Sequence, residues 1–264
     1  MVENLFINGC SFLEIYNEDA CRTTAGHHLA EKLNLNPIGY ANAGRGNDRI
    51  VATTKLFFYE NPEFIKNTFA LIGWSHVVRF DYLKKRSILK TPTNESDINR
   101  LVRDKNLDWG TAKYTQLVRG GAGLDVNKSM RLRHLGQVLS LQDFFKLNNI
   151  KYCMYNALTN KYNSEYICKK SRKSTETKSQ SPSIRPESYR AVGLETLAEK
   201  IDKRRFFEFD GESHLAFVQK SIVPFGLGKG KALTLSTIDD HPNRRGHMIW
   251  GNKLYSFIKE NNLL

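Results

Sequence analysis

The sequence predicts an α/β fold in which helices cover a mainly parallel central sheet on both faces, giving a three-layer α/β/α sandwich. Three observations lead to this prediction. Short apolar runs bounded by turn residues recur along the 264 residues, and stretches with helical spacing lie between them. Polar and glycine-rich motifs directly follow several of these runs. Because reactive groups of such sheets gather beyond the carboxyl ends of the strands, these motifs are the first candidates for function.

Three apolar runs are typical of strands. They cover residues 5–7 (LFI), 69–72 (FALI) and 150–158 (IKYCMYNAL). Each run is short and is bounded by turn-forming or polar residues, which favours a strand over a helix. Helical stretches separate the runs in the sequence, so we expect neighbouring strands to be parallel.

Three other stretches are predicted to be helices. Residues 47–59 begin with Asn47, which suits a helix N-cap, and continue with apolar residues at helical spacing. Residues 131–147 and 247–264 each place apolar side chains on one face. These side chains are Leu132, Leu135, Val138 and Leu139 in the first stretch, and Trp250, Leu254, Phe257 and Ile258 in the second.

Two regions interrupt the alternation within a chain that we otherwise expect to form one domain, residues 1–264. Residues 81–130 are charged and contain glycine without a clear period, and they are predicted to form an irregular insertion. Residues 159–235 are predicted to form a second insertion. It includes residues 169–190, whose seven basic residues, two acidic residues and six serines predict a mobile basic loop. This loop is either a solvated linker or an arm that binds a polyanion.

Composition limits the classes of protein that the chain can represent. Hydrophobic residues make up 40% of it, enough for a substantial core, and 40 Lys and Arg against 27 Asp and Glu give a formal charge of +13. A basic balance favours a polyanion or an acidic protein as partner, and a solvated basic surface is the alternative. The four cysteines form no CxxC pair, which argues against a zinc site or a disulfide framework. We expect no signal peptide and no membrane-spanning segment, because no apolar run approaches about 20 residues.

The motif GCSF contains the first candidate for catalysis. Ser11 follows the first apolar run, where its hydroxyl can point off the edge of the sheet and its N–H can face a reacting oxygen. An ordinary serine in a turn is the alternative interpretation.

Two further motifs lie where a strand is expected to end. In GRGNDR (44–49), glycines and the start of a helix suit a developing negative charge, and a tight strand-to-helix turn is the alternative. In IGWSH (72–76), Trp74 either walls a pocket or packs in the core. His76 by itself is interpreted as structural or exposed.

The motif IDDHPNRRGH (238–247) precedes the last predicted helix. An Asp and a His this close in sequence can share one loop, so that the carboxylate orients the imidazole, or they simply belong to a polar turn. Pro242 restricts the chain after His241, and Asn243 is placed to begin the helix.

Taken together, GCSF … GxxNxRI … IGWS … DxHPNxxGH resembles the SGNH hydrolases, the GDSL-type esterase and lipase superfamily. This form is similar to SGNH-like proteins encoded by tailed bacteriophages. The four motifs extend from residue 9 to residue 247, and HPNxxGH is the most distinctive of them. The resemblance implies a flavodoxin-like arrangement of the three layers, a serine nucleophile, and no metal or organic cofactor.

The resemblance also implies a role for each matching residue. Ser11 corresponds to the nucleophile and His241 to the general base, while the backbone N–H groups of Ser11 and Gly44 correspond to oxyanion donors. Asp239 is the residue expected to orient His241, with Asp240 as the alternative. The alternative nucleophile, the Cys10 thiolate, needs a nearby positive charge or a helix N-terminus, and the neighbouring sequence supplies neither.

The chain departs from the usual family pattern at three positions. Cys10 stands where an Asp commonly precedes the serine. Ser75 stands where an Asn commonly donates to the oxyanion, and loss of one such donor costs about 10²–10³ in rate. Ile238 stands where the Asp commonly lies, three residues before the histidine. Ser75 is therefore expected to be the third oxyanion donor through its hydroxyl, with Asp239 shifted by one position.

The sequence thus predicts a serine esterase that hydrolyses an acyl or acetyl ester, for which a carbohydrate ester is one candidate because the family often acts on them. The alternative is a bacteriophage structural or binding protein that keeps the fold, has lost the chemistry, and binds a polyanion or a virion protein through its basic surface. Either function implies a protein in the cytoplasm of the infected host or in the virion, without membrane attachment.

Overall fold

A computed structural model of the chain describes residues 1–14, 24–77, 79–83, 109–113, 126–158, 192–209, 211–220, 233–234 and 241–264. The predicted basic loop 169–190 lies outside these residues. In chain order the elements are β1 (Asn4–Gly9), α1 (Ala25–Leu33), β2 (Asn36–Gly39), α2 (Asn47–Glu60), the 3₁₀ turn η1 (Pro62–Phe64), β3 (Thr68–Trp74), β4 (Arg79–Leu83), β5 (Trp109–Lys113), α5 (Val126–Leu147), β6 (Lys151–Asn156), α7 (Val192–Lys200), β7 (Phe206–Phe207), α8 (His214–Lys220) and α9 (Arg244–Glu260).

A five-stranded sheet in the order β2-β1-β3-β6-β7 forms the centre of the molecule, and every neighbouring pair of its strands is parallel. The three strands predicted from apolar runs are the three middle strands β1, β3 and β6. These strands are buried along nearly their whole length, which explains why they are almost continuously apolar. The predicted α/β class with a mainly parallel central sheet is confirmed.

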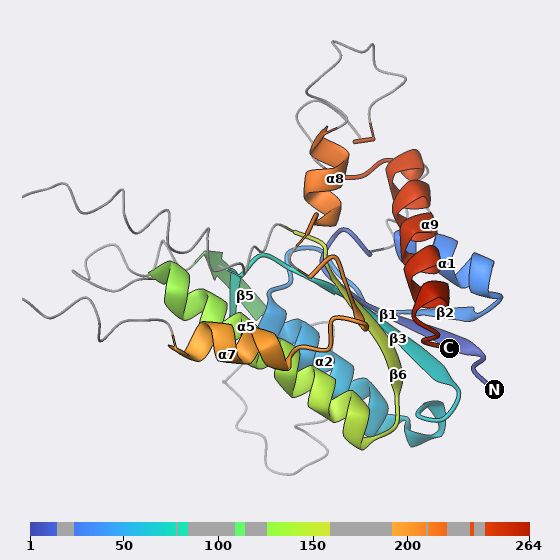
Figure 1. Cartoon of the computed structure of the whole chain (residues 1–264), viewed down its shortest axis with the longest axis horizontal. Helices are drawn as coiled ribbons and strands as arrows, with labels where there is room; N and C mark the ends of the chain where they lie inside the picture. The colour runs from blue at the N-terminus through green and yellow to red at the C-terminus, as the bar shows by residue number, and fades with distance from the viewer. Residues whose placement is uncertain are drawn as a thin grey trace, which may run out of the picture.

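Helices cover both faces of this sheet and so complete the three layers (Figure 1). Alternate side chains of each strand enter different cores, because successive residues of a strand point to opposite faces. In β1, Phe6 packs in the core beneath α2, α5 and α7, whereas Leu5 and Ile7 pack in the core beneath α1 and α9. Helix α9 lies along α1, which brings the end of the chain beside its first helix.

The predicted helices correspond to α2, α5 and α9, with two corrections. Asn47 is the first residue of α2 and not its N-cap, since Gly46 occupies that position without a side-chain cap. Leu132 is 45% exposed, because the buried stripe of α5 runs through Leu135, Val138 and Leu141 and leaves Leu132 about a third of a turn away. The start of α9 agrees with expectation, since Asn243 is its N-cap and accepts from the Gly246 N–H at 2.9 Å.

Several elements lie where the sequence predicted none. Strand β2 is four residues long and contains Pro37, which an edge strand tolerates. The predicted irregular segment 81–130 contains β5, which pairs antiparallel with β4. The predicted insertion 159–235 contains β7, the last strand of the central sheet, as well as α7 and α8.

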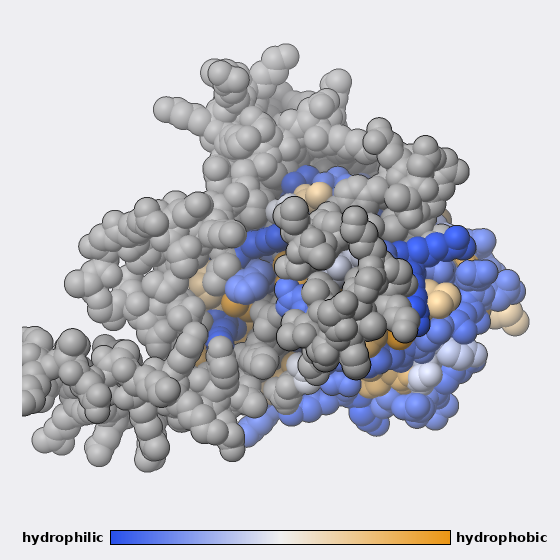
Figure 2. Space-filling view, turned by 90° about the horizontal axis from the view of Figure 1, so that it is seen from above, coloured by the Kyte–Doolittle hydropathy of each residue, from blue (hydrophilic) through white to orange (hydrophobic). Residues whose placement is uncertain are grey.

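The surface of the described residues is mostly hydrophilic on the face shown in Figure 2, where hydrophobic side chains appear in small separate groups. Among the helices that the structure describes, none is both long enough and apolar enough to cross a membrane. The motifs GCSF, GRGNDR and IGWSH lie at the end of the sheet where β1, β2 and β3 lead into loops.

Candidate active site

Ser11 lies in a tight turn directly after β1. The Leu13 N–H donates to the Cys10 carbonyl oxygen at 2.9 Å, which closes the turn around Ser11 and Phe12. The flanking side chains of Cys10, Phe12 and Leu13 are buried, with at most 3% of their surface exposed. Ser11 itself is 8% exposed, so the nucleophile candidate is nearly buried in a fixed turn at the carboxyl end of the sheet.

His241 meets Ser11 across 230 residues of sequence. Its Nε2 shares a hydrogen bond of 2.7 Å with the Ser11 Oγ. The Phe12 ring lies 5.3 Å from the His241 ring, centroid to centroid, and forms an apolar wall beside the pair. When His241 is neutral with its proton on Nδ1, Nε2 accepts from the serine hydroxyl, which is the arrangement that a general base requires.

The chain around Asn243 holds His241 in this position. The next residue, Pro242, forms an isolated antiparallel bridge with Thr234. The Asn243 N–H donates to the Leu233 carbonyl oxygen at 2.8 Å, and the Asn243 side-chain amide donates to the Thr234 carbonyl oxygen at 3.0 Å. The same side chain caps α9, so one residue ties the histidine loop both to a helix and to a neighbouring segment.

The loop between β2 and α2 lies beside the Ser11 turn. It is fastened to β1 by the N–H groups of Tyr40 and Asn42, which donate to the carbonyl oxygens of Ile7 and Gly9 at 2.8 and 3.3 Å. Gly44 in this loop has φ +72°, a left-handed conformation that glycine adopts without strain. The Gly44 N–H therefore belongs to a backbone conformation that is strained for most residues with a Cβ.

Asp81 of β4 stabilises the end of this loop by capping α2. Its two carboxylate oxygens accept from the N–H groups of Gly46 and Arg49, each at 3.0 Å. A carboxylate at a helix N-terminus satisfies unpaired N–H groups and interacts favourably with the helix dipole. Gly46 is required here, because an added Cβ would lie 2.6 Å from the Asp81 carboxylate oxygen.

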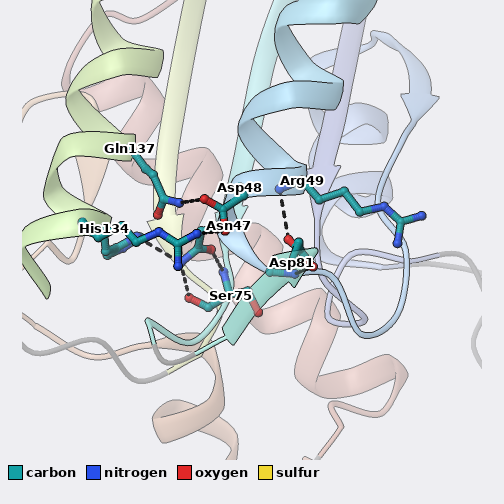
Figure 3. Close-up of polar contacts among 9 residues, drawn as sticks. Asn47, Asp48, Arg49, Ser75, Asp81, His134 and Gln137 are labelled. Atoms are coloured by element: carbon teal, nitrogen blue, oxygen red, sulfur yellow. Dashed lines mark hydrogen bonds and ion pairs between the residues drawn. The ribbon is translucent and has the colours of Figure 1, made fainter. Parts of the chain in front are cut away.

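The third predicted position, Ser75, follows β3 and is held by Asn47 (Figure 3). The Asn47 Oδ1 accepts from the Ser75 N–H at 2.8 Å, and its Nδ2 donates to the Ser75 carbonyl oxygen at 3.1 Å and to His134 Nδ1 at 3.0 Å. Ser75 is 0% exposed, and its hydroxyl accepts from Arg79 at 3.1 Å. The Ser75 hydroxyl thus lies beneath Arg79 and not at the surface of the site.

Electrostatics distinguish Cys10 from Ser11. Cys10 is 0% exposed, and burial raises the pKa of its thiol, while Arg79 and a backbone hydrogen bond from Phe12 act in the opposite direction. A positive charge thus does lie near Cys10, contrary to what the neighbouring sequence indicated, but it comes from β4. Since burial is the larger effect, the thiol stays protonated and is a poor nucleophile.

Two buried residues near the site were not identified from the sequence. Asn8 in β1 donates to Thr54 Oγ1 at 2.8 Å, and its Oδ1 accepts from Arg45 at 3.1 Å. Arg45 also donates to the Tyr40 carbonyl oxygen, and burial lowers its pKa to about 10. A charged residue inside a glycine-rich turn was the only sequence signal for this contact. The hydrogen bond between Arg45 and Asn8 connects the loop after β2 to a buried side chain of β1.

The predicted orienting carboxylates, Asp239 and Asp240, lie outside the described residues. The His76 carbonyl oxygen accepts from the Arg79 N–H at 3.0 Å, so the His76 backbone forms part of the turn between β3 and β4. Among the described residues, no group of three or more His, Cys, Asp or Glu side chains is arranged to hold a metal ion.

Comparisons with known proteins concern the whole chain. No protein-family model and no curated protein matches it. It is similar to the solved structure of the psychrotrophic esterase EstA from Pseudoalteromonas sp., at 9% identity and a TM-score of 0.47, over 98% of this chain and 97% of that one. It is also similar to a catalytic mutant of Axe2, an acetylxylan esterase from Geobacillus stearothermophilus, at 13% identity and a TM-score of 0.45, over 99% and 95% of the two chains. A GDSL-like lipase from Bacteroides thetaiotaomicron VPI-5482 aligns at 14% identity and a TM-score of 0.42, over 98% and 88%. At these identities the likeness concerns the course of the chain and not its chemistry.

Proposed function

We propose that the protein is a serine esterase of the SGNH type that hydrolyses an acyl or acetyl ester. The observation that carries the proposal is the 2.7 Å hydrogen bond between the Ser11 Oγ and the His241 Nε2. In serine-dependent acyl transfer the nucleophile and its general base lie within hydrogen-bond reach, and this contact supports those roles for Ser11 and His241. The motifs that contain the two residues are those on which the resemblance to SGNH hydrolases rests.

In the proposed reaction, His241 Nε2 takes the proton of the Ser11 hydroxyl as Oγ attacks the ester carbonyl carbon. The carbonyl oxygen becomes an oxyanion, which accepts from the backbone N–H groups of Ser11 and Gly44. Collapse of the tetrahedral intermediate breaks the bond to the alcohol, and His241 returns the proton to that alcohol. Water, deprotonated by His241, then attacks the acyl enzyme and releases the acid, which restores the Ser11 hydroxyl.

The proposal assigns the remaining role to Asp239, or to Asp240 as the alternative. A carboxylate close to the imidazole would hold His241 in the tautomer that accepts the serine proton and would stabilise the imidazolium. A carbohydrate ester is the substrate class that the resemblance favours. No metal or organic cofactor enters any of these steps.

Labelling with a fluorophosphonate probe, followed by peptide mapping, tests the proposal. We expect covalent modification at Ser11 and none in Ser11→Ala, together with loss of labelling in His241→Ala. Cys10→Ala is the matched control at the neighbouring position. It should still be labelled at Ser11, because the Cys10 thiol is buried and protonated. A folded wild type that shows neither labelling nor turnover of a nitrophenyl acetate contradicts the proposal.

The competing function is an inactive scaffold that binds a polyanion or a virion protein through basic residues. It is motivated by the serine at position 75, by the shift of the expected Asp to position 239, and by the formal charge of +13. The short contact between Ser11 and His241 weighs against the scaffold function. A site that has lost catalysis does not require its serine hydroxyl and imidazole to stay within hydrogen-bond distance. Salt-sensitive binding to DNA by a protein that does not react with the probe would favour the scaffold.

A further inference from the structure

The Arg79 guanidinium lies where three loops of the candidate site meet. Its NH1 donates to the Ser75 Oγ at 3.1 Å and makes a longer contact, at 3.5 Å, with the Arg45 carbonyl oxygen. Its charge also acts on the Cys10 thiol. These three partners follow β3, β2 and β1, which are adjacent strands of the sheet, so Arg79 sits between the loops that carry Ser11, Gly44 and Ser75.

Burial separates the roles of Ser75 and Arg79. Ser75 is 0% exposed, whereas Arg79 is partly exposed. The Ser75 hydroxyl is therefore buried where it accepts from Arg79, whereas part of the Arg79 side chain reaches the surface. The two contacts described use one of the three guanidinium nitrogens, in a group that carries five N–H donors.

The neighbouring arginines have other functions in the fold. Arg45 is buried and bonded to Asn8 and to the Tyr40 carbonyl oxygen. The Arg49 guanidinium points away from Ser75 in Figure 3, and the Arg49 backbone contributes to the helix cap on Asp81. Among the described residues, Arg79 is thus the arginine whose side chain contacts both Ser75 after β3 and the loop that carries Gly44.

We infer that Arg79 is the third oxyanion donor of the site, and that Ser75 positions it. This inference rests on the proposed esterase function. The Arg79 N–H groups donate to the carbonyl oxygen of the substrate as it gains negative charge, alongside the N–H groups of Ser11 and Gly44. A charge-assisted hydrogen bond is roughly twice as strong as a neutral one, so an arginine compensates for the absent asparagine amide. Ser75 accepts from NH1 and keeps the planar guanidinium from rotating away.

Arg79→Gln is the direct test, with Arg49→Gln as a control that removes the same charge from a side chain pointing elsewhere. With a nitrophenyl acetate we expect kcat of Arg79→Gln to fall by about 10²–10³, because the oxyanion exists only in the transition state and the intermediates. KM should change by no more than a few-fold. Arg49→Gln should keep kcat close to that of the wild type.

A second pair of measurements removes the dependence on one variant. Added guanidinium, at a concentration that leaves the wild type folded, should restore part of the activity of Arg79→Ala and none of that of Ser11→Ala. An aryl boronic acid, which forms an anionic tetrahedral adduct on a nucleophilic serine, should bind Arg79→Gln more weakly by about the factor lost in kcat/KM. Ser75→Ala should give a smaller loss, with its effect again in kcat.

The outcomes separate this inference from the proposed function. An active wild type together with Arg79→Gln at unchanged kcat, or with an effect on KM alone, overturns the role of Arg79 and leaves the esterase intact. A wild type that neither reacts with the fluorophosphonate probe nor turns over ester overturns both. An active wild type with selective loss of kcat and rescue by guanidinium supports both.

Discussion

Asn47 and Ser75 form a side-chain-to-backbone clamp at the end of β3. The Asn47 amide accepts from the Ser75 N–H at 2.8 Å and donates to the Ser75 carbonyl oxygen at 3.1 Å (Figure 3). Asn47, the first residue of α2, thereby supplies hydrogen-bond partners for the backbone of Ser75, the residue that directly follows β3. The clamp fixes the loop after β3, including the residue that contacts Arg79, to the start of the helix that follows Gly44.

Replacing Asn47 should lower stability substantially. Asn47→Ala leaves buried backbone groups of Ser75 without this partner, and each such group costs about 1–3 kcal/mol. We expect the free energy of unfolding, measured by urea denaturation, to fall by about 2–3 kcal/mol. Asp48→Ala is the neighbouring control. Its partly exposed carboxylate pairs with Arg133 and accepts from the Gln137 side-chain amide, so the loss should be smaller, about 1 kcal/mol. Equal losses in the two variants would remove the special role of the clamp.

The histidine behind this clamp makes stability depend on pH. His134 is 1% exposed and accepts from Asn47, and burial lowers its pKa to about 3. In the unfolded chain His134 takes up a proton as the pH falls through about 6.5, whereas in the folded protein it does so only near pH 3. The stabilisation is therefore complete above about pH 6.5 and is lost as the pH falls toward 3.

We expect this one group to lower the free energy of unfolding by about 1.4 kcal/mol per pH unit below about pH 6. His134→Gln removes the titrating group, so its unfolding free energy should fall less steeply between pH 6.5 and 5 than that of the wild type. Urea denaturation at several pH values measures both slopes. Parallel slopes for the two proteins would show that His134 does not take up a proton on unfolding.

How far the sequence predicts this molecule depends on whether the information is local. The strands β1, β3 and β6 were predicted because fully buried parallel strands are continuously apolar. Ser11 and His241 were paired because the motifs that contain them, at opposite ends of the chain, resemble those of SGNH hydrolases. In the structure the Ser11 Oγ and the His241 Nε2 lie 2.7 Å apart. The short edge strands β2 and β7 lack enough residues to show a period.

The supporting residues could not be assigned in this way, because their roles depend on tertiary neighbours. Asn47 has the local pattern of an N-cap, yet its side chain binds the backbone of Ser75. The cap of α2 comes from Asp81, which lies 35 residues after Gly46 in the sequence. Asp81 is the first residue of the segment 81–130, whose charged character predicted an irregular insertion, and Arg79 lies two residues before it. Their importance follows only from the position of β4 beside the start of α2.

Gly44 offers a test of the loop that presents its N–H. Its φ is +72°, and an added Cβ would meet nothing within 4 Å, so an alanine there is disfavoured by the backbone and not by crowding. The left-handed conformation costs a residue with a Cβ about 1–2 kcal/mol, and asparagine tolerates it better than alanine. We expect Gly44→Ala to lower kcat for a nitrophenyl acetate by about tenfold, equivalent to about 1.4 kcal/mol. Gly44→Asn should lose less. A larger loss in Gly44→Asn would indicate that side-chain bulk, and not the backbone, governs the loop.

Asn243 allows the fold and the chemistry of the histidine loop to be separated. Its Oδ1 caps α9 by accepting from the Gly246 N–H, and its Nδ2 donates to the Thr234 carbonyl oxygen beside Pro242. Asn243→Ala removes both contacts and should cost about 1–2 kcal/mol in stability, with slower fluorophosphonate labelling of Ser11. Asn243→Asp keeps an oxygen for the cap and loses only the donor.

The aspartate variant should therefore keep the thermal stability of the wild type to within a few degrees, because acidic residues are good N-caps and suit the helix dipole. Its labelling rate should still fall, since the segment that carries His241 has lost the contact with Thr234. The two quantities are measured on the same sample, by thermal denaturation and by the time course of labelling. If Asn243→Asp is labelled as fast as the wild type while Asn243→Ala is slower and less stable, the cap alone positions His241 and the contact with Thr234 has no part in the reaction.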